Sequence, residues 1–232
     1  MPDEAANVAR EPAGLLAGAS RVVRIAAEGV PLVAGAAVLA AVSFLLGFVW
    51  PGLLLAVLAA AIAAFFRDPQ RFPERSEGVV LAGADGRVIE LARAPLPNGG
   101  GEASTRASIF MSPLDVHVNR APVGGEVTSV EHTPGEYGAA FRDHASERNE
   151  RNLIAIHGAD GHRHTMVQVA GYLARRIICR VRVHDRIESG QRVGLIMFGS
   201  RVDQYVPREY RVTVTTGERV RAGETVIAEL ER

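Results

Sequence analysis

The chain has 232 residues, with 26 basic and 26 acidic side chains and a formal net charge of zero at pH 7. A balanced charge argues against a nucleic-acid-binding protein, which normally carries a basic surplus. The single cysteine, Cys179, excludes a disulfide framework and a cysteine-rich zinc site. Every basic residue is Arg. The absence of Lys excludes pyridoxal phosphate enzymes, P-loop NTPases and lipoyl or biotinyl carriers, which all need a lysine amine.

The N-terminal part of the chain contains a long apolar stretch. Residues 1–28 predict a loose tail, and residues 29–66 contain no charged side chain. One bilayer span needs roughly 20 apolar residues, and this stretch is nearly twice that length, with two glycines and a proline near its middle. We therefore predict a membrane-associated hydrophobic helical hairpin with helices at Val30–Val49 and Gly52–Phe66. A full span and a shallow re-entrant hairpin both remain open.

Arginines flank the apolar stretch on both sides. Arg21 and Arg24 precede it, and Arg67 and Arg71 follow it. Because positive charge marks the cytoplasmic ends of membrane segments, both ends of the hairpin are predicted to face the cytoplasm. The alternative is a hairpin buried in the core of a soluble protein.

Residues 67–232 are predicted to form a mainly β domain. Short runs of Val, Ile and Leu are broken by Gly, Pro, Asp and Asn at brief intervals, which is typical of short strands joined by turns. Asp160-Gly161 between two such runs indicates a hairpin turn. The strand candidates are Val79–Leu81, Val88–Leu91, Val127–Val130, Leu153–His157, Thr165–Val169, Ile177–Val183 and Arg211–Thr215.

An internal repeat points to a symmetric arrangement of these strands. The segment from Asp185 to Val193 recurs from Glu218 to Val226, with a glycine at the same place in each copy. Repeated glycine turns that lead into short strands are typical of small quasi-symmetric β-sandwiches of the lipoyl, or barrel-sandwich, type. The missing Lys excludes the swinging-arm function of a true lipoyl domain.

A Gly-Ser pair follows an apolar run near the C-terminus, at Gly199-Ser200. In a strained turn, a serine hydroxyl can attack the preceding carbonyl, convert the peptide into an ester and cleave the chain by β-elimination. The serine then becomes a pyruvoyl group, a ketone that accepts electrons during decarboxylation without any Lys. Most Gly-Ser pairs are ordinary turns, so this interpretation depends on further motifs.

Five motifs in order carry a resemblance to a known family. They are Phe65-Phe66-Arg67-Asp68-Pro69, Ala84-Asp85-Gly86-Arg87-Val88, MSPLDVHVNRAP from Met111 to Pro122, Glu147-Arg148-Asn149 and Phe198-Gly199-Ser200. The chain resembles the phosphatidylserine decarboxylases, in their short bacterial and archaeal branch, from about residue 30 to the C-terminus. The resemblance implies decarboxylation of phosphatidylserine to phosphatidylethanolamine in phospholipid biosynthesis. It implies a covalent pyruvoyl cofactor from Ser200, without pyridoxal phosphate or metal, in a protein on the cytoplasmic face of the bacterial inner membrane.

The resemblance also assigns roles to individual residues. It implies self-cleavage between Gly199 and Ser200 into a β chain, 1–199, and an α chain, 200–232. Asp85 is expected to orient the catalytic histidine and stabilise its charge. His117 is expected to act as the base for Ser200 and as an acid or base in decarboxylation.

One position departs from the family pattern. Long-form members have a second histidine three residues after the first, where this chain has Arg120. An arginine cannot act as a base near neutral pH, so Arg120 is expected to hold the substrate phosphate or carboxylate instead. His144, Arg148 and Asn149 lie in a polar segment that is expected to contact the headgroup.

Two alternatives to this function remain open on sequence grounds. The substrate could be another serine phospholipid, such as archaetidylserine, because the sequence does not report the lipid tail. A non-catalytic membrane-anchored adaptor with a lipoyl-like domain would explain the apolar stretch and the repeat, but not Asp85, His117 and Gly199-Ser200. The expected partners are the membrane, the phospholipid substrate and the two chains of the precursor. A homodimer of αβ pairs remains an open alternative, and no nucleic-acid partner is expected.

Overall fold

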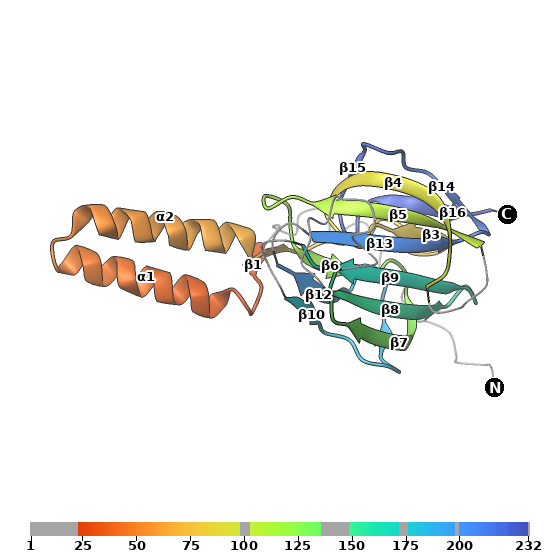
Figure 1. The fold of residues 1–232 in the computed structure, drawn as a ribbon, viewed down its shortest axis with the longest axis horizontal. Helices are drawn as coiled ribbons and strands as arrows, with labels where there is room; N and C mark the ends of the chain where they lie inside the picture. Colours follow the sequence, from red (N-terminus) through yellow and green to blue (C-terminus); the bar gives the residue numbers. More distant parts are fainter. Residues whose placement is uncertain (1–22, 98–102, 136–148, 172–175, 198–199, 232) are drawn as a thin grey trace, which may run out of the picture.

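The computed structural model describes residues 23–97, 103–135, 149–171, 176–197 and 200–231. It confirms the prediction of a mainly β protein, with two helices projecting from a β domain (Figure 1). In chain order the described elements are β1 (Val23–Ile25), α1 (Val30–Leu45), α2 (Val49–Phe65), β2 (Arg67–Pro69), β3 (Val79–Leu81), β4 (Gly86–Pro95), β5 (Ala103–Met111), β6 (Val118–Arg120), β7 (Gly125–Thr133), β8 (Arg151–Gly158), β9 (Arg163–Val169), β10 (Ile177–Cys179), β11 (Arg186–Ile187), β12 (Arg192–Ile196), β13 (Ser200–Pro207), β14 (Tyr210–Val212), β15 (Arg219–Val220) and β16 (Val226–Leu230).

The helices α1 and α2 lie side by side and run in opposite directions (Figure 1). The turn between them contains Gly47, whose φ of 82° is accessible to glycine at little cost. The second helix begins at Val49, earlier than the predicted Gly52. Pro51 does not prevent this because it lies in the first turn, where a helix has no use for its backbone N–H.

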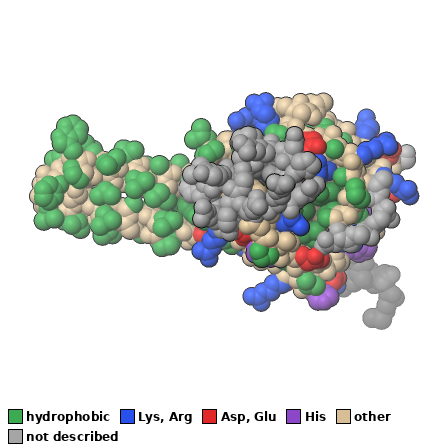
Figure 2. Space-filling view, in the orientation of Figure 1, with side chains coloured by type: hydrophobic (Ala, Val, Ile, Leu, Met, Phe, Trp, Pro, Cys, Tyr) green, Lys and Arg blue, Asp and Glu red, His purple; other side chains and the backbone are tan. Residues whose placement is uncertain are grey.

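Apolar side chains cover the surface of both helices (Figure 2). Leu45, Trp50 and Leu54 are 86%, 81% and 71% exposed. Monomeric soluble proteins rarely expose a continuous apolar surface of this kind, so the surface indicates an apolar partner. Within the described ranges, neither helix has both the length and the apolar character needed to cross a bilayer.

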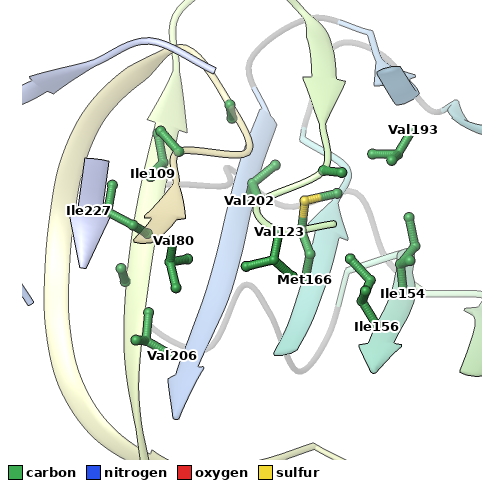
Figure 3. Close-up of a cluster of buried hydrophobic side chains, with 14 of the residues drawn as sticks. Val80, Ile109, Val123, Ile154, Ile156, Met166, Val193, Val202, Val206 and Ile227 are labelled. Carbon is green, nitrogen blue, oxygen red and sulfur yellow. The ribbon is translucent and has the colours of Figure 1, made fainter. Parts of the chain in front are cut away.

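The β domain is built around a large antiparallel sheet with strand order β11-β7-β8-β9-β13-β5-β4-β15. Two three-stranded sheets, β10-β12-β6 and β14-β16-β3, complete it. Side chains from the large sheet, such as Ile109, Met166 and Val202, form the core with Val80 and Ile227 of a small sheet (Figure 3). All of these but Met166 are β-branched residues, which suit strands.

The two copies of the sequence repeat occupy equivalent places. The strands β11 and β15 lie at the two ends of the large sheet. Ile187 pairs with Gly125 at one end, and Val220 pairs with Gly86 at the other. Gly190 and Gly223 have positive φ angles of 77° and 71° and lie against each other, so the repeated glycines form the tight turns that the pattern predicts.

The foot of the helices, where β1 precedes α1 and β2 follows α2, packs onto the β domain. β1 and β2 pair with each other there, and Ala26 donates a backbone hydrogen bond to Phe66. Phe65 and Phe66 are buried in a separate apolar cluster with Val116, Val118 and Leu195. The helices therefore rest directly on the segment that contains His117.

Candidate active site

Ser200 is the first residue of β13, where it lies opposite Met111 of β5. Its side chain is fully buried, and its hydroxyl has no hydrogen-bond partner among the described residues. Burying an unpaired hydroxyl is unfavourable, and each such group in a native protein needs an explanation. An oxygen kept available for a reaction is one such explanation.

His117 lies beside the chain that leads to Ser200. The backbone N–H of Ile196 donates to the His117 carbonyl at 3.3 Å, four residues before Ser200. The pairing of Ser200 with Met111 and this hydrogen bond are two contacts between the parts of the chain around Ser200 and His117. His117 is fully buried, and its Nε2 also lacks a hydrogen-bond partner in the described part of the chain.

The protonation of His117 follows from its surroundings. Its Nδ1 lies 2.9 Å from the Asp115 carbonyl oxygen, which can only accept, so Nδ1 donates and Nε2 carries the free lone pair. Burial lowers the pKa of His117 from 6.5 to about 4, the charge of Arg67 adds to this, and Asp115 and Asp85 partly oppose it. His117 is therefore neutral at pH 7, with Nε2 able to accept a proton.

The last residue of α2 forms part of the His117 pocket. The Phe65 ring lies against the imidazole, with 4.2 Å between the ring centroids and 37° between the ring planes. Phe65 is itself only 6% exposed. An aromatic ring in this position excludes water from the imidazole, so part of the burial of His117 comes from the end of the helical hairpin.

Asp85 precedes β4 and is nearly buried. Both of its carboxylate oxygens accept hydrogen bonds from Arg71, and one also accepts from the Ala222 N–H at 2.9 Å. A Cβ at the following residue, Gly86, would lie 2.0 Å from the Phe110 carbonyl oxygen, so only glycine lets β4 approach β5 here. Asp85 is thus held next to the part of β5 that pairs with Ser200.

No hydrogen bond in the described residues joins Asp85 directly to His117 or Ser200. The contact that orients the His117 ring comes from the Asp115 carbonyl. Asp85 acts on His117 through its charge, and its own partner is Arg71. Burial alone would lower the pKa of Arg71, but its hydrogen bonds to Asp85 and the Asp85 charge outweigh this and raise that pKa.

Arg120 is buried and makes contacts within the protein. Its guanidinium donates to the carbonyls of Gly190 and Pro69 at 2.9 and 2.8 Å and to Asp68 at 3.3 Å. Burial and the neighbouring Arg192 lower its pKa to about 10, so it remains charged at neutral pH. These contacts hold β2 against the domain, and the predicted substrate contact of Arg120 has no support among them.

The other predicted headgroup residues are only partly described. Asn149 is buried and donates to the Ala170 carbonyl at 2.8 Å. His144, Arg148 and Gly199 lie outside the described residues. In the ranges that the structure does describe, no group of three or more His, Cys, Asp or Glu side chains is placed to hold a metal ion.

A cavity of about 800 Å³ opens beside the site, at the foot of the helices. Its lining includes Asp85 and Arg71 together with Asp115 and Val116, the residues just before His117. Arg67 also lines it. The sequence motifs did not indicate an active-site role for Phe65, Arg67 or Arg71. Phe65 and Arg67 lie within the Phe65-Phe66-Arg67-Asp68-Pro69 motif, and Arg71 lies two residues beyond it.

Comparisons with known proteins show the family of this chain. A family model described as phosphatidylserine decarboxylase matches residues 58–228. A protein of Saccharopolyspora erythraea named phosphatidylserine decarboxylase proenzyme is 47% identical, covering 88% of this chain and 87% of its own length. Proteins with the same name from Burkholderia multivorans and Mycolicibacterium smegmatis are 45% and 49% identical, covering 90% and 75% of this chain and 97% and 76% of their own lengths. This chain therefore belongs to the phosphatidylserine decarboxylase family.

Proposed function

We propose that this protein is a proenzyme that cleaves itself and then decarboxylates phosphatidylserine to phosphatidylethanolamine. The observation that supports the proposal is a pair of buried atoms, Ser200 Oγ and His117 Nε2, that have no hydrogen-bond partner among the described residues. The Ser200–Met111 pairing and the Ile196–His117 hydrogen bond connect the parts of the chain that contain them. Together, Ser200 and His117 provide a hydroxyl nucleophile and a neutral base, which are the groups that self-cleavage requires.

Self-cleavage begins with proton transfer from Ser200 to His117. The Ser200 oxygen attacks the Gly199 carbonyl carbon, and the Gly199–Ser200 peptide bond becomes an ester. Removal of the Ser200 α-proton then expels the Gly199 carboxylate, which separates the β chain from the α chain. Water replaces the nitrogen of the former serine, ammonia leaves, and a pyruvoyl group remains at the start of the α chain.

The residues around Ser200 fit such a group. A pyruvoyl ketone reacts with the substrate amine and withdraws electrons as carbon dioxide leaves, which is chemistry that no side chain of this protein supplies. His117 supplies a proton acceptor that burial keeps neutral. Asp85 and Arg71 form an ion pair, and the Asp85 carboxylate is close enough for its charge to act on His117.

The two chains stay together after cleavage. The strand β13 of the α chain pairs with β5 and β9 of the β chain over most of its length. The strands β15 and β16 pair with β4 and β3. Cleavage before Ser200 leaves all of these ladders intact, so the new N-terminus is held at the site.

We also propose that α1 and α2 attach the protein to the cytoplasmic face of the cell membrane by shallow insertion. Their exposed apolar surface supports insertion into lipid (Figure 2). Arg67, the first residue of β2, supports contact with anionic headgroups. A lipid substrate would then reach the cavity beside Asp85 without leaving the bilayer.

Charges at the tip of the helices are expected to abolish this attachment. Trp50 is the only tryptophan of the chain, so its fluorescence should shift to shorter wavelength when vesicles containing phosphatidylglycerol are added. The double variant Leu45→Glu/Trp50→Glu should no longer float with such vesicles, because each charge costs about 2.5 kcal/mol or more in the hydrocarbon region. Val183→Glu, a substitution at an exposed residue of the β domain, is the matched control. Equal flotation of both variants would contradict insertion by the tip.

We propose, further, that the β domain is a quasi-symmetric sandwich of the lipoyl type. The equivalent pairings of β11 and β15 at the two ends of the large sheet support this, as does the contact between Gly190 and Gly223.

The proposed function is tested by supplying the purified protein with two lipids. Phosphatidylserine vesicles should yield carbon dioxide and phosphatidylethanolamine in equal amounts. Turnover of an ether-linked serine phospholipid in strong preference to phosphatidylserine would favour the archaetidylserine alternative. An intact chain that acts on neither lipid would favour the adaptor.

A further inference from the structure

The cavity at the foot of the helices has an uneven charge distribution. Four arginines and three carboxylates line it. The three ion pairs in the lining are Arg71 with Asp85, Arg219 with Asp115 at 3.2 Å, and Arg221 with Glu224 at 3.7 Å. Arg67 is the fourth arginine, and no described carboxylate pairs with it. One uncompensated positive charge thus faces the cavity.

The position of Arg67 is fixed by backbone groups. Its guanidinium donates to the Ala64 carbonyl at 2.7 Å and to the Leu114 carbonyl at 2.5 Å. These two bonds use one N–H of each terminal nitrogen, so three of the five N–H donors remain for a ligand. A guanidinium held in this way loses little further side-chain freedom when it binds an anion.

The location of Arg67 matches the depth of a lipid phosphate. Arg67 lies two residues after Phe65, the last residue of α2, and so at the end of the apolar helices. If the helices enter the bilayer, this point lies at the level of the headgroup phosphates. The same cavity is also lined by Asp85 and by Val116, the residue before His117.

We propose that Arg67 binds the phosphodiester of the phospholipid substrate in this cavity, with Arg219 and Arg221 at its rim. The inference rests on the proposed decarboxylase function and names the group that holds its substrate. The phosphodiester carries one negative charge and two free oxygens, which suits the planar donor array of an arginine. The serine part of the headgroup then extends toward Asp85 and His117. This arrangement assigns the phosphate contact to Arg67 in place of the buried Arg120.

The test uses a short-chain phosphatidylserine below its micelle concentration, so that no membrane takes part. Arg67→Gln should raise KM about tenfold or more and leave kcat within about twofold, because a charge-assisted hydrogen bond is lost from substrate binding. Arg75→Gln is the matched control, since Arg75 pairs with Glu229 and does not line this cavity. Inorganic phosphate is the second probe and should compete with substrate less well in Arg67→Gln than in the unaltered enzyme.

Each result either supports the proposed phosphate contact or overturns it. An unchanged KM for the soluble lipid overturns the proposal, and if activity on anionic vesicles falls at the same time, Arg67 contacts the membrane surface instead. A raised KM without competition by inorganic phosphate supports a site for the lipid phosphodiester alone. If Arg67→Gln does not cleave itself, the KM of Arg221→Gln is measured instead, because the Arg221 side chain is 66% exposed. A raised KM then supports the proposal, and an unchanged KM overturns it. Inactivity of the unaltered enzyme would count against the proposed function itself.

Discussion

Ser200→Ala is expected to yield a single uncleaved chain with no decarboxylase activity. The variant lacks the oxygen that attacks Gly199, so no ester and no pyruvoyl group form. The loss should be complete within detection, because without the pyruvoyl group the protein has no ketone to react with the substrate amine. Denaturing electrophoresis and assay of carbon dioxide release from labelled phosphatidylserine measure the two effects.

Ser200→Ala should still fold, which makes it a clean test. The hydroxyl has no partner among the described residues, so its removal breaks no described hydrogen bond, and β13 keeps its pairing with β5. Ser200→Ala should therefore unfold cooperatively on heating, as a protein with intact packing does. Ser108→Ala is a contrasting variant, because it removes a buried hydroxyl that accepts a hydrogen bond from Arg201. Ser108 does not belong to the site. Cleavage of Ser200→Ala at the same position would contradict the assignment of the nucleophile.

Phe65→Ala is expected to raise the pKa of His117 from about 4 toward 6.5 by about one unit or more. Burial is the largest cause of the lowered pKa, and the Phe65 ring covers the imidazole. The direction of this pKa change follows from the positive charge of the protonated imidazole. Water that enters the space left by the ring stabilises the protonated imidazole, so the variant binds its proton at higher pH.

The measurement is an NMR titration of labelled histidine in the uncleaved Ser200→Ala background, with His117→Gln to assign the signal. Phe65→Leu keeps an apolar side chain in place and is the matched control, with a pKa that should stay near 4. A value unchanged in Phe65→Ala would show that the helices do not contribute to the burial of His117.

The same pKa shift affects stability. The folded protein holds His117 at a pKa of about 4, below the 6.5 of an unfolded chain. The unfolded state therefore binds more protons between these values, and stability falls as pH drops from 6.5 toward 4. In Phe65→Ala this loss of stability at acidic pH should be smaller, because the pKa values of His117 in the folded and unfolded states lie closer together.

Much of the β domain could be predicted from the sequence because its signals are local. Val79–Leu81 is a strand with the predicted bounds, and Gly161 adopts the positive φ of 81° that the Asp160-Gly161 turn requires. The repeat predicted equivalent turns, which the structure contains at Gly190 and Gly223. The strands β5 and β13 were not among the candidates, since polar residues such as Ser108, Arg201 and Asp203 interrupt their apolar pattern. These polar groups are buried because they bond to one another.

The roles of the site residues stay predictions, and their contacts could not be predicted from the sequence. Motif order singled out Ser200, His117 and Asp85, and in the structure Ser200 pairs with Met111 at the end of β5 while Asp85 directly precedes β4. The sequence could not show that Arg71 binds Asp85 or that Arg120 is directed at Asp68, because these contacts join residues 14 and 52 positions apart. It also could not show that Phe65 covers His117, since that contact depends on how α2 meets the β domain.

The most direct test of this account is the intact mass of the purified protein. The account predicts two polypeptides that meet between Gly199 and Ser200, and a small chain whose N-terminus is blocked and carries a carbonyl that reacts with hydroxylamine. A single chain with the mass of the full sequence, from protein that is folded and extracted from membranes, would contradict it.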